Sequence, residues 1–264
     1  MLPPTFQCKL YAVPLSAAGR AVWLYMQECE VMHVMEKLVP EDIYNKIEEI
    51  SPKRSIGVVL PVLHDSGVYL YGCISILKYL ADKCQRFYPA DRVERAKVDM
   101  YLEWHSQHLH NASANVLELT TPSGPGLFRN YIKEAAVSAD GMVQQTEKRT
   151  TDIELVGAAV REYMSMINVM EKVMLANTDF LCGAQITIAD IVAVTELSFH
   201  QIIDIDLKEY PKVHAWFLRV SSTFKNWDVV NAEFVQYIPS AVKQQQALRQ
   251  EQKNIKRHGK DARG

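Results

Sequence analysis

The first 85 residues alternate between the apolar spacing of strands and that of helices. A turn-forming Asp65-Ser66-Gly67 separates two short apolar runs and is typical of a hairpin. Pro40, followed by acidic residues, suits the first turn of a helix. The predicted elements are strand 7–13, helix 16–28, strand 31–39, helix 40–50, strands 61–64 and 68–71, and helix 73–83. This βαβ-ββα order predicts a mixed four-stranded sheet with a right-handed crossover.

Beyond residue 90 the strand pattern stops and helical spacing takes over. Thr187 is predicted to cap one of these helices, and Asp190 three residues later completes a capping box. Pro239 is expected to close the helical part of the chain. The predicted helices cover 93–119, 154–176, 187–200 and a stretch with an apolar stripe from Val213 to Phe224.

Length and composition fit a folded protein of one large or two small domains. The chain has 264 residues, of which 48% are hydrophobic and 23% charged, so disorder of the bulk is excluded. We divide it into an α/β domain at 1–86, an all-helical domain at 91–240 and a polar tail at 241–264.

The charge and the cysteine content indicate which partners and which cellular compartment to expect. The net charge of −2 gives no overall footprint for nucleic acid. The tail carries seven Lys or Arg against two acidic residues, which indicates a solvated segment or a contact with a polyanion or another protein. No apolar run is long enough to predict a membrane span. Five scattered cysteines without a CxxC pair favour a reducing compartment, and we expect the cytoplasm.

Four segments in this order resemble the glutathione transferase family, and its theta class in particular. They are LSAAGRAV at 15–22, LPVLHDSGVYLY at 60–71, RAKVDMYLEWH at 95–105 and FLCGAQITIADIVAVTEL at 180–197. The resemblance implies a thioredoxin-like glutathione-binding domain before an all-α domain. It also implies glutathione as co-substrate, a small electrophile as its partner in the reaction, and a homodimer.

The implied chemistry is attack of the glutathione thiolate on an electrophile. A free thiol has a pKa of about 8.5, and lowering it by about two units needs roughly 2.7 kcal/mol of preferential thiolate stabilisation. Ser16 matches the theta-class serine and could donate to that thiolate at the start of a helix. The alternative is that Ser16 serves as the N-cap of the helix.

The same resemblance assigns the glutathione-binding residues. Pro61 matches the family's cis-proline, and Leu60 before it would offer its backbone to the cysteinyl unit of glutathione. Gly72 and Cys73 occupy the Glu-Ser pair that holds the γ-glutamyl end. A glycine supplies no ammonium partner and a thiol is a weak donor, so this part of the site is atypical.

Three further positions depart from the family pattern. Asp42 stands where the theta class has a histidine, and Gln107 and His110 stand where an acid and a base are expected. The loop 51–60 is about four residues longer than usual in the family. At about 1–3 kcal/mol for each lost charged contact, glutathione affinity would fall by orders of magnitude.

Two further candidates, a histidine cluster and a cysteine, are better explained by structural roles than by metal binding or reactivity. His105, His108 and His110 cluster on one predicted helix, with 105 and 108 on a common face, but no nearby Cys or carboxylate completes a metal set and we predict no metal. A pocket wall or a subunit interface is the favoured interpretation. Cys73 at a helix start is either a reactive thiol or, as favoured, a small buried hydrophobe.

The sequence thus predicts a theta-like, serine-type glutathione transferase with an atypical glutathione site. The alternative is a protein that keeps the fold but acts as a non-catalytic interaction or scaffold module. Gly72→Glu with Cys73→Ser would tighten glutathione binding about tenfold in a weakened transferase, provided that position 72 has an ordinary φ.

Overall fold

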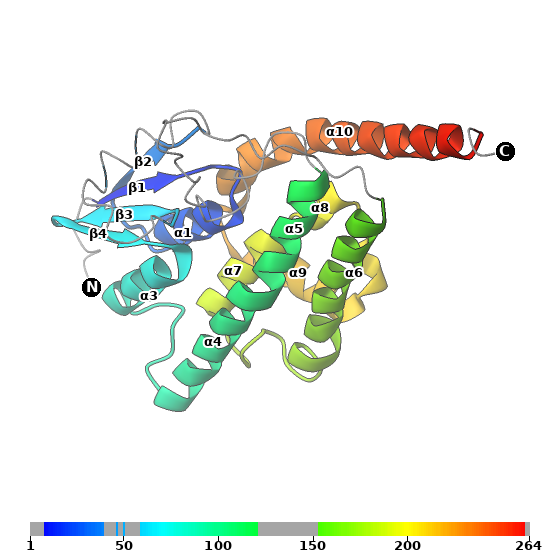
Figure 1. Cartoon of the computed structure of the whole chain (residues 1–264). Coiled ribbons are helices and arrows are strands. Elements are labelled where there is room, and N and C mark those ends of the chain that lie inside the picture. Colours follow the sequence, from blue (N-terminus) through cyan, green and yellow to red (C-terminus); the bar gives the residue numbers. More distant parts are fainter. Residues whose placement is uncertain (1–7, 40–45, 47–49, 51–58, 121–152, 262–264) are drawn as a thin grey trace.

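The computed structural model describes residues 8–39, 46, 50, 59–120 and 153–261. A sheet with two helices packed on it is followed by a larger bundle of helices (Figure 1). This confirms the predicted thioredoxin-like domain followed by an all-α domain, whereas the exact domain boundaries stay a prediction. The predicted helix 40–50 and the breaker at 121–126 lie largely or wholly outside the described residues.

The sheet has four strands in the order β2-β1-β3-β4. The central strand β1 pairs in parallel with β2 and antiparallel with β3, and β3 pairs antiparallel with β4, as the βαβ-ββα pattern predicts. The Leu60–Pro61 peptide bond just before β3 is cis, as the resemblance implies. The strands are β1 (Cys8–Ala12), β2 (His33–Lys37), β3 (Val62–Asp65) and β4 (Val68–Tyr71).

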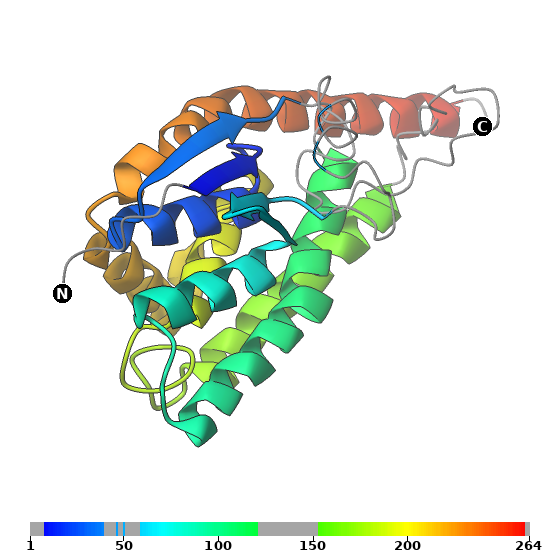
Figure 2. The same cartoon turned by 90° about the vertical axis from the view of Figure 1, so that its left-hand side faces the viewer.

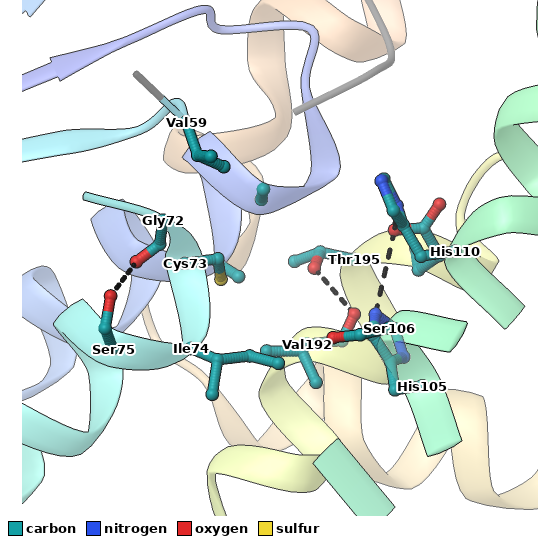
Figure 3. Close-up of a pocket in the computed structure, with 13 residues that line it drawn as sticks. Val59, Gly72, Cys73, Ile74, Ser75, His105, Ser106, His110, Val192 and Thr195 are labelled. Atoms are coloured by element: carbon teal, nitrogen blue, oxygen red, sulfur yellow. Dashed lines mark hydrogen bonds and ion pairs between the residues drawn. The ribbon is translucent and has the colours of Figure 1, made fainter. Parts of the chain in front are cut away.

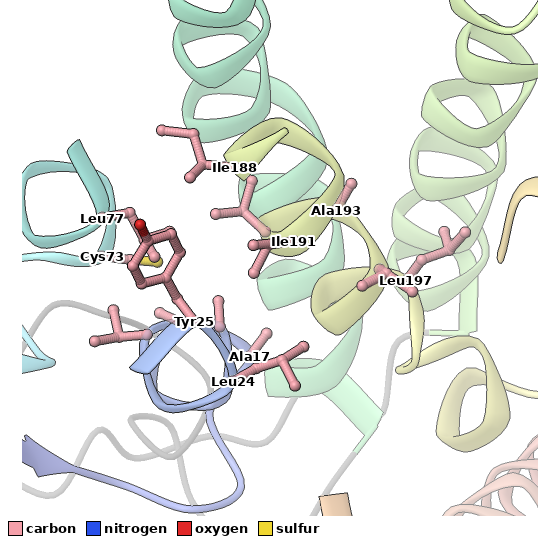
Figure 4. Close-up of a cluster of buried hydrophobic side chains, with 14 of the residues drawn as sticks. Ala17, Leu24, Tyr25, Cys73, Leu77, Ile188, Ile191, Ala193 and Leu197 are labelled. Carbon is pink, nitrogen blue, oxygen red and sulfur yellow. The ribbon is translucent and has the colours of Figure 1, made fainter. Parts of the chain in front are cut away.

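Helices α1 (Ala17–Glu28) and α3 (Cys73–Cys84) lie between the sheet and the helical domain in both views (Figure 2). Gly19 allows α1 to begin close to β1, because a β-carbon there would lie 2.8 Å from the carbonyl oxygen of Val13. One apolar cluster continues from α1 and α3 into the helical domain, so the core spans both parts (Figure 4).

A single long helix was expected over 93–119, and the structure divides it with one wide turn. The π-helical turn η1 (His105–Leu109) separates α4 (Arg92–Trp104) from α5 (His110–Thr120). The predicted helix 154–176 likewise consists of α6 (Ile153–Val169) and the π-helical turn η2 (Met170–Met174).

The predicted capping box begins α7. Thr187 accepts from the backbone of this helix, and Asp190 accepts in return from the Thr187 N–H at 2.9 Å. Because α7 is buried along its whole length, water cannot reach the N–H groups at its start, and the capping box gives them partners. The helices of this region are α7 (Ile188–Leu197), α8 (His200–Ile203), the 3₁₀ turn η3 (Leu207–Glu209) and α9 (Pro211–Thr223).

The last helix, α10 (Trp227–Asp261), corrects the expectation that Pro239 closes the helical part of the chain. The helix continues through Pro239 and extends past α5 (Figure 1), and beyond the proline Ala241 and Gln245 are still buried. Their burial compensates for the backbone hydrogen bond that a proline removes. Within the described residues, no helix combines the length and the apolar character that crossing a membrane would require.

Candidate functional site

A pocket of about 180 Å³ lies where the two parts of the chain meet (Figure 3). The N-terminus of α3 and one side of α1 form its wall in the α/β part, and the π-helical turn and α7 form its wall in the helical part. Apolar side chains such as Ile74 and Val192 share this lining with hydroxyl, imidazole and carboxylate groups. A pocket of this kind suits a small ligand with one polar end.

The predicted glutathione-binding residues lie at or beside this pocket. Gly72 and Cys73 line it. Leu60 and Pro61 do not, but Val59 just before them does, and the Gly72 N–H donates to the carbonyl oxygens of Val59 at 3.0 Å and Pro61 at 2.9 Å. The cis-proline turn is therefore tied directly to the start of α3.

Ser16 is buried and caps α1. Its hydroxyl oxygen accepts from the Gly19 N–H at 3.4 Å, and its own N–H donates to the Val13 carbonyl oxygen at 3.0 Å. Ser16 does not line the pocket. The cap hydrogen bond uses a lone pair of the hydroxyl oxygen, whereas stabilising a thiolate would use its proton, so the two roles are compatible.

Gly72 supplies a backbone conformation that other residues rarely adopt. Its φ is +82° and its ψ is 144°, and it precedes the first turn of α3 without any side-chain cap. Because this φ is not an ordinary one, Gly72→Glu with Cys73→Ser is no longer expected to tighten glutathione binding. The uncapped first turn of α3 still presents N–H groups at the pocket, where they favour a carboxylate.

We expect Gly72→Ala to lower the free energy of unfolding by about 1–3 kcal/mol, because a β-carbon at this φ is strained. Space is not the problem, since the nearest atom to an added β-carbon would be 3.6 Å away. Chemical denaturation would measure the change. Gly157→Ala inside α6 is the control and should be neutral or stabilising. Equal effects of the two substitutions would contradict the assignment of strain to Gly72.

Cys73 is packed as a small hydrophobe. It lies among apolar side chains that include Leu77 and Ile188 (Figure 4). Burial, with a smaller contribution from the carboxylate of Glu196, raises the pKa of its thiol well above the ordinary value. These observations favour the structural interpretation over a reactive thiol.

The π-helical turn brings together two histidines that the sequence did not pair. In a regular α-helix residues five apart point about 140° away from each other, but this turn bonds the His110 N–H to the His105 carbonyl oxygen. Both rings then face Glu196 of α7, with His110 Nδ1 at 3.1 Å and His105 Nε2 at 3.8 Å from its Oε2. Ser113 donates to the other carboxylate oxygen.

Electrostatics hold this cluster in a defined state of ionisation. Burial alone would raise the pKa of Glu196, but His110, His105 and Ser113 together lower it below the ordinary value. Burial lowers the pKa of His105 to about 4, against the opposing effect of Glu196. The pocket floor therefore carries an ionised carboxylate beside a neutral His105 at neutral pH. His105 Nδ1 is buried without a hydrogen-bond partner among the described residues.

A buried arginine joins this cluster from the α/β part. Arg20 of α1 is fully buried and donates to Ser198 Oγ at 3.0 Å and to the Thr195 carbonyl oxygen at 3.2 Å. Its guanidinium lies 4.0 Å from the ring centre of Phe234. Burial lowers the pKa of Arg20 to about 9, and Glu196 counteracts that effect. Its hydrogen bonds to Ser198 and Thr195 link α1 to the C-terminal end of α7 at the domain boundary.

The remaining predicted positions lie apart from the pocket or outside the described residues. His105 and His110 line the pocket, in agreement with the favoured interpretation as a pocket wall, whereas His108 is exposed and does not line it. Gln107 is exposed and hydrogen-bonds to Glu103. Asp42 and most of the loop 51–60 are not described. In the described part of the chain, no three His, Cys, Asp or Glu side chains are arranged to hold a metal ion.

The arrangement of a cis-proline turn, a capped α1 and an α/β–helical boundary pocket is that of a glutathione transferase fold. A family model for the glutathione S-transferase C-terminal domain matches residues 131–223. Solved structures agree: human glutathione transferase theta-2, in complex with glutathione and an unknown ligand, has a TM-score of 0.72 at 22% identity, covering 94% of this chain and 99% of that one.

The relatives found by sequence are theta-class glutathione S-transferases. Glutathione S-transferase theta-1 of Rattus norvegicus is 26% identical over 221 residues, which is 81% of this chain and 82% of the relative. Theta-1 of Mus musculus is 27% identical with the same coverage. The apo form of human glutathione-S-transferase T1-1 shares the fold with a TM-score of 0.69 at 22% identity, covering 93% and 98% of the two chains. Over most of its length the chain is thus similar to theta-class glutathione transferases.

Proposed function

We propose that the protein conjugates the thiolate of glutathione to small electrophiles. The observation that carries this proposal is the direct hydrogen bonding between the cis-Pro61 turn and the first turn of α3 at the edge of a boundary pocket. Leu60 and Pro61 would hold the cysteinyl unit of glutathione. The N–H groups that begin α3 at Cys73 would receive the γ-glutamyl carboxylate.

The thiolate is formed, in this proposal, next to the start of α1. The glutathione thiol gives its proton to solvent, the Ser16 hydroxyl keeps its own proton and donates a hydrogen bond to the sulfur, and the helix N-terminus adds its positive dipole end. Together these favour the thiolate over the thiol, so the sulfur attacks the electrophile at neutral pH. The glutathione site is atypical because Gly72 offers no side chain to the ammonium group.

The electrophile would occupy the boundary pocket. Apolar side chains such as Val192 and Ile74 would contact its body, and the buried His105 with its unpartnered Nδ1 would meet a polar group. The pocket volume of about 180 Å³ supports a small substrate. We further propose a cytoplasmic location, which the free state of all five cysteines supports, and a homodimer, as the resemblance to the theta class implies.

Calorimetric titration of the intact protein with glutathione tests the first requirement of the proposal, which is that glutathione binds. Binding is expected, followed by consumption of glutathione when an electrophile such as an aryl halide is added. If the folded protein binds no glutathione, the transferase proposal is wrong, and the non-catalytic interaction module takes its place.

Substitutions at Ser16 separate its two roles. We expect Ser16→Ala to raise the pKa of bound glutathione and to lower turnover at neutral pH about tenfold or more, because the hydroxyl donor is lost. The ultraviolet absorbance of the bound thiolate, followed against pH, would measure the shift. Ser16→Thr keeps the hydroxyl and should retain activity.

Ser16→Asp is the matched control for the cap. An aspartate caps a helix as well as a serine does, but its carboxylate donates no proton and repels a thiolate. Because Ser16 is buried, the aspartate charge costs some stability, but we expect this variant to fold with α1 capped and to be nearly inactive. Full activity of the aspartate variant would show that Ser16 acts only as a cap.

A further inference from the structure

The floor of the boundary pocket presents groups that accept hydrogen bonds. Glu196 of α7 is part of the pocket lining. His105 and His110, whose rings contact its carboxylate, lie across the pocket from the start of α3 (Figure 3). An ionised carboxylate accepts hydrogen bonds and donates none, so Glu196 calls for a donor in whatever ligand reaches the floor.

Glu196 keeps room for a further donor. Ser113 donates to Oε1, His110 Nδ1 lies 3.1 Å from Oε2, and His105 Nε2 lies 3.8 Å from the same oxygen. The last separation is too long for a hydrogen bond, so two hydrogen bonds reach this carboxylate among the described residues. An ionised carboxylate has about four lone-pair positions, and about half of them are therefore left for a ligand.

His105 adds a second acceptor to the floor. Its Nε2 faces Glu196 Oε2, and an ionised oxygen there favours the neutral ring that carries its proton on Nε2. Nδ1 is then a lone-pair acceptor, and it is buried without a hydrogen-bond partner in the part of the chain that the structure describes. A ligand group that only accepts hydrogen bonds would pair with neither residue, and Glu196 would repel a negatively charged group.

The rest of the lining fits a small apolar body and leaves glutathione its own place. The N–H groups that begin α3, which would receive the γ-glutamyl carboxylate, lie on the side opposite the histidines, so the two ends of the pocket differ in charge preference. A volume of about 180 Å³ suits one ring with a short arm. The apolar lining residues are Ala18, Ala21, Val59, Ile74 and Val192.

We propose that the boundary pocket binds small molecules with a protonated amino group through Glu196, and that the electrophile belongs to this class. The second part rests on the proposed function, whose other substrate it names. An ammonium group brings three N–H donors and a positive charge, which match the free acceptor positions and the charge of the carboxylate. Electrophiles with a carboxylate or sulfonate at this end are excluded by repulsion.

Calorimetric titration of the full chain with unreactive probes tests the preference without glutathione. We expect benzylamine, which is protonated at neutral pH, to bind at least about tenfold more tightly than benzyl alcohol, which has the same shape. Benzoate should bind more weakly than either. The preference should persist in high salt, because salt screens a buried pair of charges less than a surface pair. Equal affinities for benzylamine and benzyl alcohol would overturn the proposal.

Glu196→Gln keeps the shape of the side chain but removes its charge, so the affinity for benzylamine should fall to about that for benzyl alcohol. Glu103→Gln is the matched control, because Glu103 is exposed and lies outside the pocket, and it should keep the native preference. If Glu196→Gln does not fold, Ile74→Phe locates the probe instead, since a larger side chain at this partly exposed position fills the pocket. Benzylamine binding that the folded variants do not weaken contradicts the assignment.

Turnover connects the preference with the proposed reaction. With glutathione present, a chloronitrobenzene that carries an aminomethyl group should react faster than one that carries a carboxylate, each relative to its rate without the protein. The two possible failures are distinguishable. A protein that binds no glutathione loses the transferase proposal, while calorimetry still decides whether Glu196 binds the amine. Turnover without preference for the amine overturns the substrate class alone.

Discussion

Replacing Asp190 with alanine is expected to lower the free energy of unfolding by about 3 kcal/mol or more. Its carboxylate does more than complete the capping box of α7. It also accepts from the Leu181 N–H at 3.0 Å and from Trp216 Nε1 at 2.9 Å, and the side chain is fully buried. Alanine would remove the partner of four buried donors, which are three N–H groups and the Thr187 hydroxyl, and each buried donor left unpaired costs about 1–3 kcal/mol.

Asp91→Ala is the matched control for this variant. Asp91 also caps a helix, accepting from the Val93 and Glu94 N–H groups, but it is exposed, so water replaces it at a cost of about 1 kcal/mol. Denaturant unfolding of both variants would measure the difference. Similar losses in the two proteins would mean that the contacts of Asp190 with Leu181 and Trp216 add nothing to its capping role.

The order of the elements could be predicted because each depends on local pattern. The Asp65-Ser66-Gly67 turn, the spacing of the strands and the Thr187–Asp190 box are set by residues within a few positions of one another, and all three are found as predicted. The continuation of α10 beyond Pro239 was missed because it depends on burial against distant elements. A proline alone predicts an end.

The polar cluster at the pocket floor could not be predicted from the sequence either, because it also depends on contacts between residues far apart in the chain. Glu196 meets His110 across 86 positions of sequence, and Arg20 meets Ser198 across 178. The sequence does not reveal the π-helical turn that aligns His105 with His110, because the apolar positions of the helices on either side keep the spacing of a regular helix. One signal was present: Arg20 and Glu196 are charged residues inside apolar helical runs, where a charge is rare unless it has a partner.

Acidification is expected to weaken the fold between pH 6.5 and 4 through His105. Burial lowers the pKa of His105 to about 4 in the folded protein, while the unfolded chain binds its proton at the ordinary value near 6.5. The unfolded state therefore takes up more protons in this interval. Stability is fully present above pH 6.5 and falls by about 1.4 kcal/mol for each pH unit below it. Glu196 adds a further loss only below its ordinary pKa, because its folded pKa is lowered.

His105→Leu should flatten this part of the pH dependence, since leucine takes up no proton and Glu196 keeps His110 and Ser113 as partners. Thermal or denaturant unfolding at pH 7, 6 and 5 would give the two slopes. His108→Leu is the control, because His108 lies on the same turn but is exposed, and its slope should match the native one. If the His105 variant loses stability with acid as steeply as the native protein does, the neutral His105 beside an ionised Glu196 is not the state of the pocket floor.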